Sequence, residues 1–149
     1  MLPSERGGHI MWIHEHTVET EVGAEAIWKV LRDVNNWACW DTSMEAVVLE
    51  GPFEVGSHVS MTPTGQDPIR SVIVAVEENE LYADETEFGG VRLRFSHALE
   101  RLANGVGTRV VHRLEITGPD ADRVGPELGP AITADFPEAM DALLGRAAA

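Results

Sequence analysis

The chain has 149 residues, 44% of them hydrophobic, which suits one domain with a substantial buried core. Its formal charge at pH 7 is −14, because 25 acidic side chains outnumber 11 lysines and arginines. A field of this sign repels phosphate backbones and anionic lipid, so neither nucleic acid nor a membrane surface is an expected partner.

Two further features concern the cell compartment. No segment has the uninterrupted apolar run of a transmembrane helix or a signal-peptide core, so membrane insertion is not expected. The single cysteine, Cys39, excludes an internal disulfide and favours the reducing cytoplasm. We expect this cysteine to be a small apolar packing residue rather than a nucleophile.

The N-terminal end is polar and rich in glycine. We expect residues 1–9 to form a disordered tail and residues 10–149 to form a single domain. Residues 12–22 alternate in polarity and are rich in β-branched side chains, which predicts a first strand. One face of this strand carries three glutamates and must meet water, so His14 and His16 lie on the inward face.

The next segment changes to the period of a helix. Ile27, Trp28 and Leu31 share one stripe, and charged residues occupy the opposite side. An Asn-Asn pair is expected to end this helix. Trp37 and Trp40 follow three residues apart, so both can project from one face of a short second helix.

The middle of the chain consists of short strand-like runs separated by turn residues, which predicts an antiparallel meander. The expected strands are 46–49, 58–61, 70–76, 81–88, 91–102 and 108–116. The last two strands alternate clearly, with Leu93, Phe95, His97 and Leu99 on one face of the first and Val110, His112, Leu114 and Ile116 on one face of the second. Their other faces are mostly polar, so the sheet is expected to be covered on one side only.

A long helix is predicted at the C-terminal end. Its apolar stripe steps by three or four residues and consists of Leu128, Ile132, Phe136, Met140, Leu143 and Leu144. Pro130 suits the first turn of a helix, so residues 125–130 are interpreted as the helix entry. Pro137 is less easily placed, because a proline in a helix interior costs about 3 kcal/mol and forces a kink. Either the helix bends there, or it consists of two pieces.

Several groups of residues together carry a resemblance to a known superfamily. They are Val18 to Val22, Ala26-Ile27-Trp28 with Leu31 and Asp33, Trp37 with Trp40, Leu49-Glu50-Gly51-Pro52 with Gly56, and the C-terminal stripe. With the element order, they make the chain similar to the START-like (SRPBCC) superfamily over about residues 10–146. This superfamily includes the Bet v 1-like and the polyketide cyclase/dehydrase and lipid-transport proteins.

The resemblance implies an α+β helix-grip fold, in which a curved antiparallel sheet of about seven strands wraps around a long C-terminal helix. In this fold the sheet and the helix enclose a cavity that usually holds an apolar or aromatic ligand. The expected cavity residues are His14, His16, Trp37, Trp40, Met61, Phe95, Leu114, Phe136 and Met140. The superfamily's motifs are structural, so activity must be argued from the site.

His97 and His112 are the candidate catalytic residues. If the turn between their strands centres on Asn104-Gly105, the two histidines are direct cross-strand neighbours, with Cβ atoms about 5 Å apart. Two inward histidines at that distance cannot both be cationic at low cost. A neutral pair can hydrogen-bond a ligand carbonyl or enol and can act as general acid and base near neutral pH.

Two other interpretations of the histidines stay open. Each can be a buried polar group that is satisfied by its neighbours. Alternatively His14 and His16, two apart on one strand face, could share a metal ion with a third ligand from His97 or His112. No carboxylate is clearly placed to help, and no glycine-rich phosphate loop or nucleophile elbow occurs, so neither a metal nor a cofactor is expected.

Two classes of function remain. The first is binding of a small hydrophobic or aromatic molecule, with acid–base chemistry of the polyketide cyclase/dehydratase type as an added option. The second is a protein-interaction module, as in the chaperone-activating members of the superfamily. A filled interior favours interaction, whereas an open cavity of several hundred Å³ favours a ligand. Whether the chain forms a homodimer is left open.

Overall fold

The computed structural model describes residues 11–149, so the expected tail lies outside the described residues. The strands are β1 (Met11–Thr20), β2 (Met44–Glu50), β3 (His58–Pro63), β4 (Ile69–Glu77), β5 (Leu81–Phe88), β6 (Val91–Arg101) and β7 (Thr108–Thr117). The helices are α1 (Ala24–Arg32), the 3-10 helix η1 (Val34–Cys39), α2 (Ala121–Thr133) and α3 (Phe136–Ala148). Within the described part of the chain, no helix is long and apolar enough to cross a bilayer.

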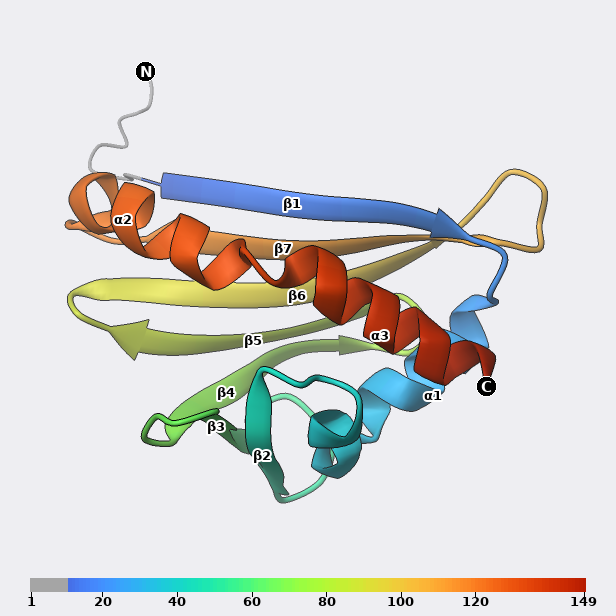
Figure 1. The fold of residues 1–149 in the computed structure, drawn as a ribbon, viewed down its shortest axis with the longest axis horizontal. Coiled ribbons are helices and arrows are strands. Elements are labelled where there is room, and N and C mark those ends of the chain that lie inside the picture. Colours follow the sequence, from blue (N-terminus) through green and yellow to red (C-terminus); the bar gives the residue numbers. More distant parts are fainter. Residues whose placement is uncertain (1–10) are drawn as a thin grey trace.

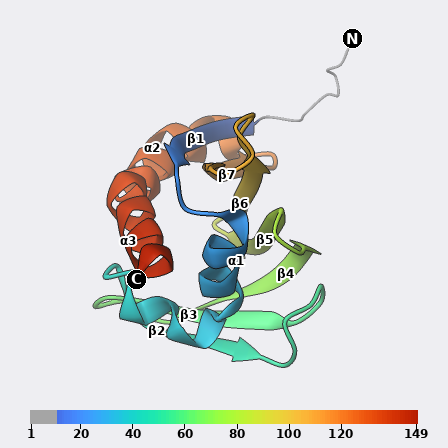
Figure 2. The ribbon, with the colours of Figure 1, turned by 90° about the vertical axis from the view of Figure 1, so that its right-hand side faces the viewer.

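The strands form one antiparallel sheet in the order β1-β7-β6-β5-β4-β3-β2. The sheet curves from β1 to β2, while α2 and α3 run across its open side (Figure 1, Figure 2). Irregular register between Met44 and Ala46 and between Ile73 and Ala75 accompanies this curvature. The predicted seven-stranded α+β helix-grip fold is confirmed.

The predicted faces of the strands are confirmed where the sequence alternates most clearly. In β1 every second residue is exposed, and His14 and His16 fall among the half-buried ones. The register of β6 and β7 pairs His97 directly with His112. Gly105, at a φ of 77°, lies in the turn that fixes this register.

The C-terminal helix consists of two pieces, one of the two arrangements expected from Pro137. α2 ends at Thr133, and Pro137 lies in the first turn of α3, where its missing N–H is harmless. The interpretation of Pro130 as a first-turn residue was wrong, because Pro126 and Pro130 both lie inside α2. Both prolines are on the exposed side of the helix, where water can bind the backbone carbonyls that they leave unpaired.

α2 packs on the sheet through two glycines. Gly125 and Gly129 are one turn apart, and the indole of Trp12 on β1 lies directly against them. A Cβ on Gly125 would approach the Cβ of Trp12 to 2.6 Å, and a Cβ on Gly129 would overlap the indole ring. The segment 125–130 is therefore a close helix–strand contact rather than a helix entry.

We expect Gly129→Ala to lower the free energy of unfolding by about 1–3 kcal/mol, because the added methyl displaces the Trp12 ring. The better helix propensity of alanine acts in the opposite direction and contributes about 1 kcal/mol of stability. Gly145→Ala is the matched control, since nothing lies within 4 Å of its added Cβ. Urea denaturation measures both variants, and equal gains for the two would contradict the proposed contact.

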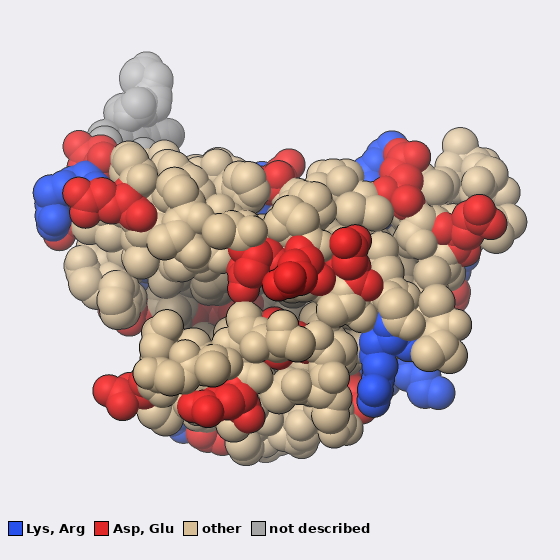
Figure 3. Space-filling view, in the orientation of Figure 1, with Lys and Arg blue, Asp and Glu red and all other residues tan. Residues whose placement is uncertain are grey.

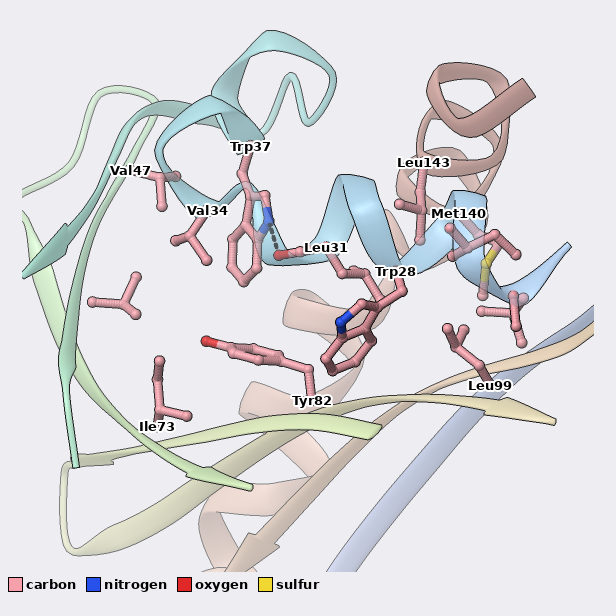
Figure 4. Close-up of a cluster of buried hydrophobic side chains, with 14 residues drawn as sticks. Trp28, Leu31, Val34, Trp37, Val47, Ile73, Tyr82, Leu99, Met140 and Leu143 are labelled. Atoms are coloured by element: carbon pink, nitrogen blue, oxygen red, sulfur yellow. Dashed lines mark hydrogen bonds between the residues drawn. The ribbon is translucent and has the colours of Figure 1, made fainter. Parts of the chain in front are cut away.

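The buried side chains form two clusters. The larger one joins α1, η1 and α3 to strands β2–β7, and it includes Trp28, Trp37 and Tyr82 (Figure 4). The indole N–H of Trp37 donates a hydrogen bond to the carbonyl oxygen of Leu31 at 2.9 Å. The second cluster lies between α2, the start of α3 and strands β6 and β7, and it includes Leu114 and Phe136.

The convex face of the sheet carries arginine–glutamate pairs. Arg113 on β7 contacts Glu15 on β1 at 2.5 Å, and Arg109 contacts Glu19 at 2.8 Å. Exposed pairs of this kind stabilise the fold by about 1 kcal/mol or less each.

Cys39 is exposed, so its expected packing role was wrong. It lies at the end of η1, on the side that faces solvent.

Candidate ligand cavity

A cavity of about 340 Å³ lies between the concave face of the sheet and the helices η1 and α3. The molecular surface is hollowed between α2 and α3 on one side and the β2–β3 region on the other (Figure 3). Most of the wall is apolar. Its large apolar side chains are Trp37, Trp40, Met44, Met61, Ile69, Leu93, Phe95, Ile132, Phe136, Met140 and Leu143.

The structure brings most of the predicted site residues to this cavity. The lining includes His97, His112, Trp37, Trp40, Met61, Phe95, Phe136 and Met140. His14, His16 and Leu114 face the same side of the sheet but do not line the cavity. Phe136 and α2 cover this end of the sheet: the rings of His14 and Phe136 lie edge-to-face at 5.9 Å, and Leu114 is fully buried beneath.

The histidines form a row across neighbouring strands. His16 pairs with His112, His112 with His97, and His97 with Tyr82, so the row crosses β1, β7, β6 and β5. The rings of His97 and His112 stack with centroids 4.1 Å apart. Phe136 stacks on the other side of His112 at 3.7 Å. His112 is therefore held between two rings, while His97 is at the open end of the stack.

Burial keeps the two lining histidines neutral. It lowers the pKa of His97 to about 4, and it lowers the pKa of His112 well below its usual range, with smaller contributions from neighbouring histidines. An efficient general base has a pKa near the working pH, so the acid–base role expected of this pair is not favoured. A neutral imidazole still offers one donor and one acceptor, and Nδ1 of His97 has no hydrogen-bond partner among residues 11–149.

A buried carboxyl group lies beside the histidines on β5. Asp84 is only 2% exposed, and its Oδ2 accepts a hydrogen bond of 2.8 Å from the hydroxyl of Tyr82. In the part of the chain that the structure describes, its Oδ1 has no hydrogen-bond partner, and neither does the Oγ of Ser71 on the neighbouring strand. Burial raises the pKa of Asp84 to about 7, although the Tyr82 hydroxyl partly offsets this effect. Burial and the nearby Asp84 also raise the pKa of Tyr82.

Every charged side chain in the wall is acidic. Asp41, Asp84 and Asp135 line the cavity, and among the described residues no lysine or arginine does so. Partial burial, followed by the negative charge of Asp41 and by that of Glu138, raises the pKa of Asp135. Acidic side chains gather at the edge of the hollow, over α3 (Figure 3). The cavity therefore has a negative rim and a carboxyl group at its floor.

Sequence reasoning missed Asp84, Tyr82 and Ser71. The sequence predicts the strand 81–88 but does not assign its two faces, because Asp84 is followed by Glu85 and the polarity does not alternate there. Burial supplies the missing signal: Tyr82 and Asp84 are buried, whereas Glu87 faces solvent. The aromatic Tyr82 could have fixed the inward parity, since residues two apart on a strand share a face.

The metal alternative finds no geometric support in residues 11–149. Within that range, no group of three or more His, Cys, Asp or Glu side chains is placed to hold a metal ion. His16 and His112 pair across strands, but the stacked arrangement of His112 between Phe136 and His97 directs ring faces rather than ring nitrogens at its neighbours.

Known structures share this architecture. Zhui aromatase/cyclase from Streptomyces sp. R1128 has 19% identity and a TM-score of 0.72, over 93% of this chain and 94% of that one. Norcoclaurine synthase from Thalictrum flavum, in complex with dopamine and hydroxybenzaldehyde, has 15% identity and a TM-score of 0.70, over 92% and 88%. A hypothetical protein from Helicobacter pylori has 13% identity and a TM-score of 0.70, over 98% and 91%.

At such identities these similarities show the fold alone. No curated protein matches the sequence. The family described as polyketide cyclase / dehydrase and lipid transport matches residues 11–149, which is the whole of the described structure. Because that match agrees with the helix-grip architecture, the chain belongs to the polyketide cyclase / dehydrase and lipid transport family of the START-like superfamily.

Proposed function

We propose that the protein binds a small apolar or aromatic molecule in this cavity. The observation that carries the proposal is a set of buried polar atoms that have no hydrogen-bond partner among the described residues: Trp40 Nε1, Ser71 Oγ, Asp84 Oδ1 and His97 Nδ1. All four belong to residues that line the cavity. Buried polar groups almost always have hydrogen-bond partners, so atoms left free around an apolar cavity suit a ligand that completes them.

Two further observations support a ligand over a protein-interaction module. The cavity volume of about 340 Å³ is in the range of small-molecule sites, whereas an interaction module is expected to have a filled interior. The similar norcoclaurine synthase structure holds two small aromatic molecules. Within this proposal the part of His97 is a hydrogen bond to the ligand rather than proton transfer, because burial keeps its pKa near 4.

Filling the cavity should abolish binding. Ala139 lines the cavity from α3, so we expect Ala139→Phe to weaken binding of the neutral indole alcohol tryptophol at least tenfold. Ala148→Phe, at the exposed end of α3, is the matched control and should leave the affinity unchanged. Isothermal titration calorimetry measures both variants. Unchanged tryptophol binding by Ala139→Phe would place the ligand elsewhere, and native mass spectrometry of freshly purified protein would show any small molecule that co-purifies.

A further inference from the structure

The charged side chains that line the cavity all have the same sign. The carboxyl groups of Asp41, Asp84 and Asp135 line it, and none of the described lysines or arginines does. The arginines of the sheet point outward, where they pair with glutamates on the convex face. The two lining histidines are held neutral by burial. Nothing in the described wall supplies a positive charge to match the acids.

Of these three carboxyl groups, that of Asp84 has the greatest need of a hydrogen-bonding or cationic partner. It is only 2% exposed, and the bond that Oδ2 accepts from the Tyr82 hydroxyl is the one hydrogen bond that the described residues give its side chain. None of the ion pairs formed by residues 11–149 includes it. Its Oδ1 is enclosed and has no partner within residues 11–149, and the Oγ of Ser71, which also has none there, lies on the adjacent strand of the same wall. Buried carboxylates in proteins are normally paired with a cation or with several donors.

We propose that the ligand of this cavity is an organic cation, an ammonium group carried on an aromatic or apolar body, and that the ammonium binds Oδ1 of Asp84. The apolar body lies against the aromatic and methionine wall. Ser71 Oγ accepts a second ammonium proton. This inference rests on the proposed ligand-binding function and specifies the chemical class of the ligand.

The remaining charges favour the same class. Asp41 and Asp135 stand on the lining of the cavity, so a cation gains energy along the whole approach and an anion loses it. Carboxylates, phosphates and other anionic ligands meet three acidic side chains and no compensating base. A neutral ligand can satisfy Oδ1 with a hydroxyl group, but it leaves the negative charge of Asp84 without a counter-ion. The lining also includes Trp37 and Trp40, and tryptophan is the side chain that attracts an ammonium group most strongly.

Three probes with one ring system separate these cases. Tryptamine is a cation, tryptophol is its neutral counterpart, and indole-3-acetate is an anion. At pH 8 we expect calorimetry to give at least tenfold tighter binding for tryptamine than for tryptophol, and the weakest binding for indole-3-acetate. In Asp84→Asn the affinity for tryptamine should fall to that for tryptophol measured with the same variant, so that the preference for the cation disappears. Asp122→Asn, on the exposed side of α2, removes one charge far from the cavity and should leave the preference intact.

The wild-type protein supplies a second test that needs no variant. Between pH 8 and pH 5.5 Asp84 takes up a proton, because burial raises its pKa to about 7. The preference for tryptamine over tryptophol should therefore shrink as the pH falls. The groups that face or neighbour Asp84 are Tyr82 and Glu85 on its own strand, His97 on β6, and Asp41 and Asp135 across the cavity. Loss of the pH response in Asp84→Asn would assign it to Asp84 rather than to these neighbours.

The outcomes are distinct. Equal or weaker binding of tryptamine than of tryptophol would overturn the cation assignment and leave the cavity as a site for neutral ligands. Tightest binding of indole-3-acetate would overturn it as well. If none of the three probes binds, or if Ala139→Phe does not affect them, the proposed ligand-binding function fails together with the inference.

Discussion

We expect Asp84→Asn to be more stable than the wild-type protein at pH 8 and to lose this advantage at pH 5. In the folded protein Asp84 keeps its proton up to a pH of about 7, whereas an unfolded aspartate releases its proton near the ordinary value of 3.8. Between these two values the folded state binds more protons, so its stability falls as the pH rises. From pH 5 to pH 8 this contribution amounts to about 3 kcal/mol.

Asparagine has the shape of aspartate and no charge to bury, so the variant should lack this fall. Urea denaturation at pH 5 and pH 8 gives the two free energies of unfolding for each protein. The buried Asn amide group still needs hydrogen-bond partners, and leaving it without them costs about 1–3 kcal/mol. Because this cost is the same at pH 5 and pH 8, it cancels when the two free energies of unfolding are compared. Asp122→Asn is the control for the loss of one negative charge. A pH dependence that is the same in wild type and Asp84→Asn would show that Asp84 is not the buried acid described above.

The effect of the histidine pair on stability should be opposite to that of Asp84, because the free energy of unfolding should fall as the pH is lowered. Burial lowers the pKa of His97 from 6.5 to about 4, so the unfolded chain takes up a proton in a range where the folded chain does not. The stability associated with neutral His97 is complete above pH 6.5 and is lost as the pH falls towards 4. At full extent it is about 3 kcal/mol, and about 2 kcal/mol is lost by pH 5.

His97→Gln tests this contribution, because glutamine is polar, similar in length and neutral at every pH. The difference in the free energy of unfolding between pH 7 and pH 5 should change by about 2 kcal/mol relative to wild type. His112, whose pKa is lowered in the same direction, is unchanged in this variant, so part of the acid sensitivity should remain. An identical pH difference in the two proteins would mean that His97 is not buried neutral.

The expected loss of stability at pH 8 distinguishes Asp84 from a residue that only supports the fold. A buried acid that costs stability at neutral pH, with one oxygen free, is a poor structural element. Groups of this kind concentrate at functional sites, where the cost is accepted for binding or catalysis. Asp84→Asn should therefore be more stable and should also lose its preference for the cation. These two effects together distinguish a functional acid from a structural one.

The parts of the fold that local patterns determine were predictable from the sequence. β1 could be assigned to its faces because three glutamates require water on one side. The pairing of His97 with His112 followed from a short turn at Asn104-Gly105, which leaves little freedom in register. Pro137 indicated a break in the C-terminal helix, although the alternation of the stripe alone could not decide between a bend and two helices.

The features that were missed depend on tertiary packing. Pro130 looked like a helix start, but α2 extends nine residues before it because its docking on Trp12 outweighs the backbone bonds lost at the prolines. Cys39 looked like a packing residue, but η1 turns it to solvent. His14 and His16 were placed on the correct face, yet the position of Phe136 and α2 decides which part of that face remains open. The depth of Asp84 likewise depends on what covers β5.

The division of the interior into two clusters has a consequence for how the molecule opens. α2 belongs to one cluster and α1 to the other, and the cavity lies between them. Elements that pack in different clusters can exchange their amide protons through separate local openings. A ligand that touches Met140 of one cluster and Ile132 beside the other joins them. With the ligand bound, the two clusters should open as one cooperative unit. The slowest-exchanging amides of α2 and α1 should then report the same opening event.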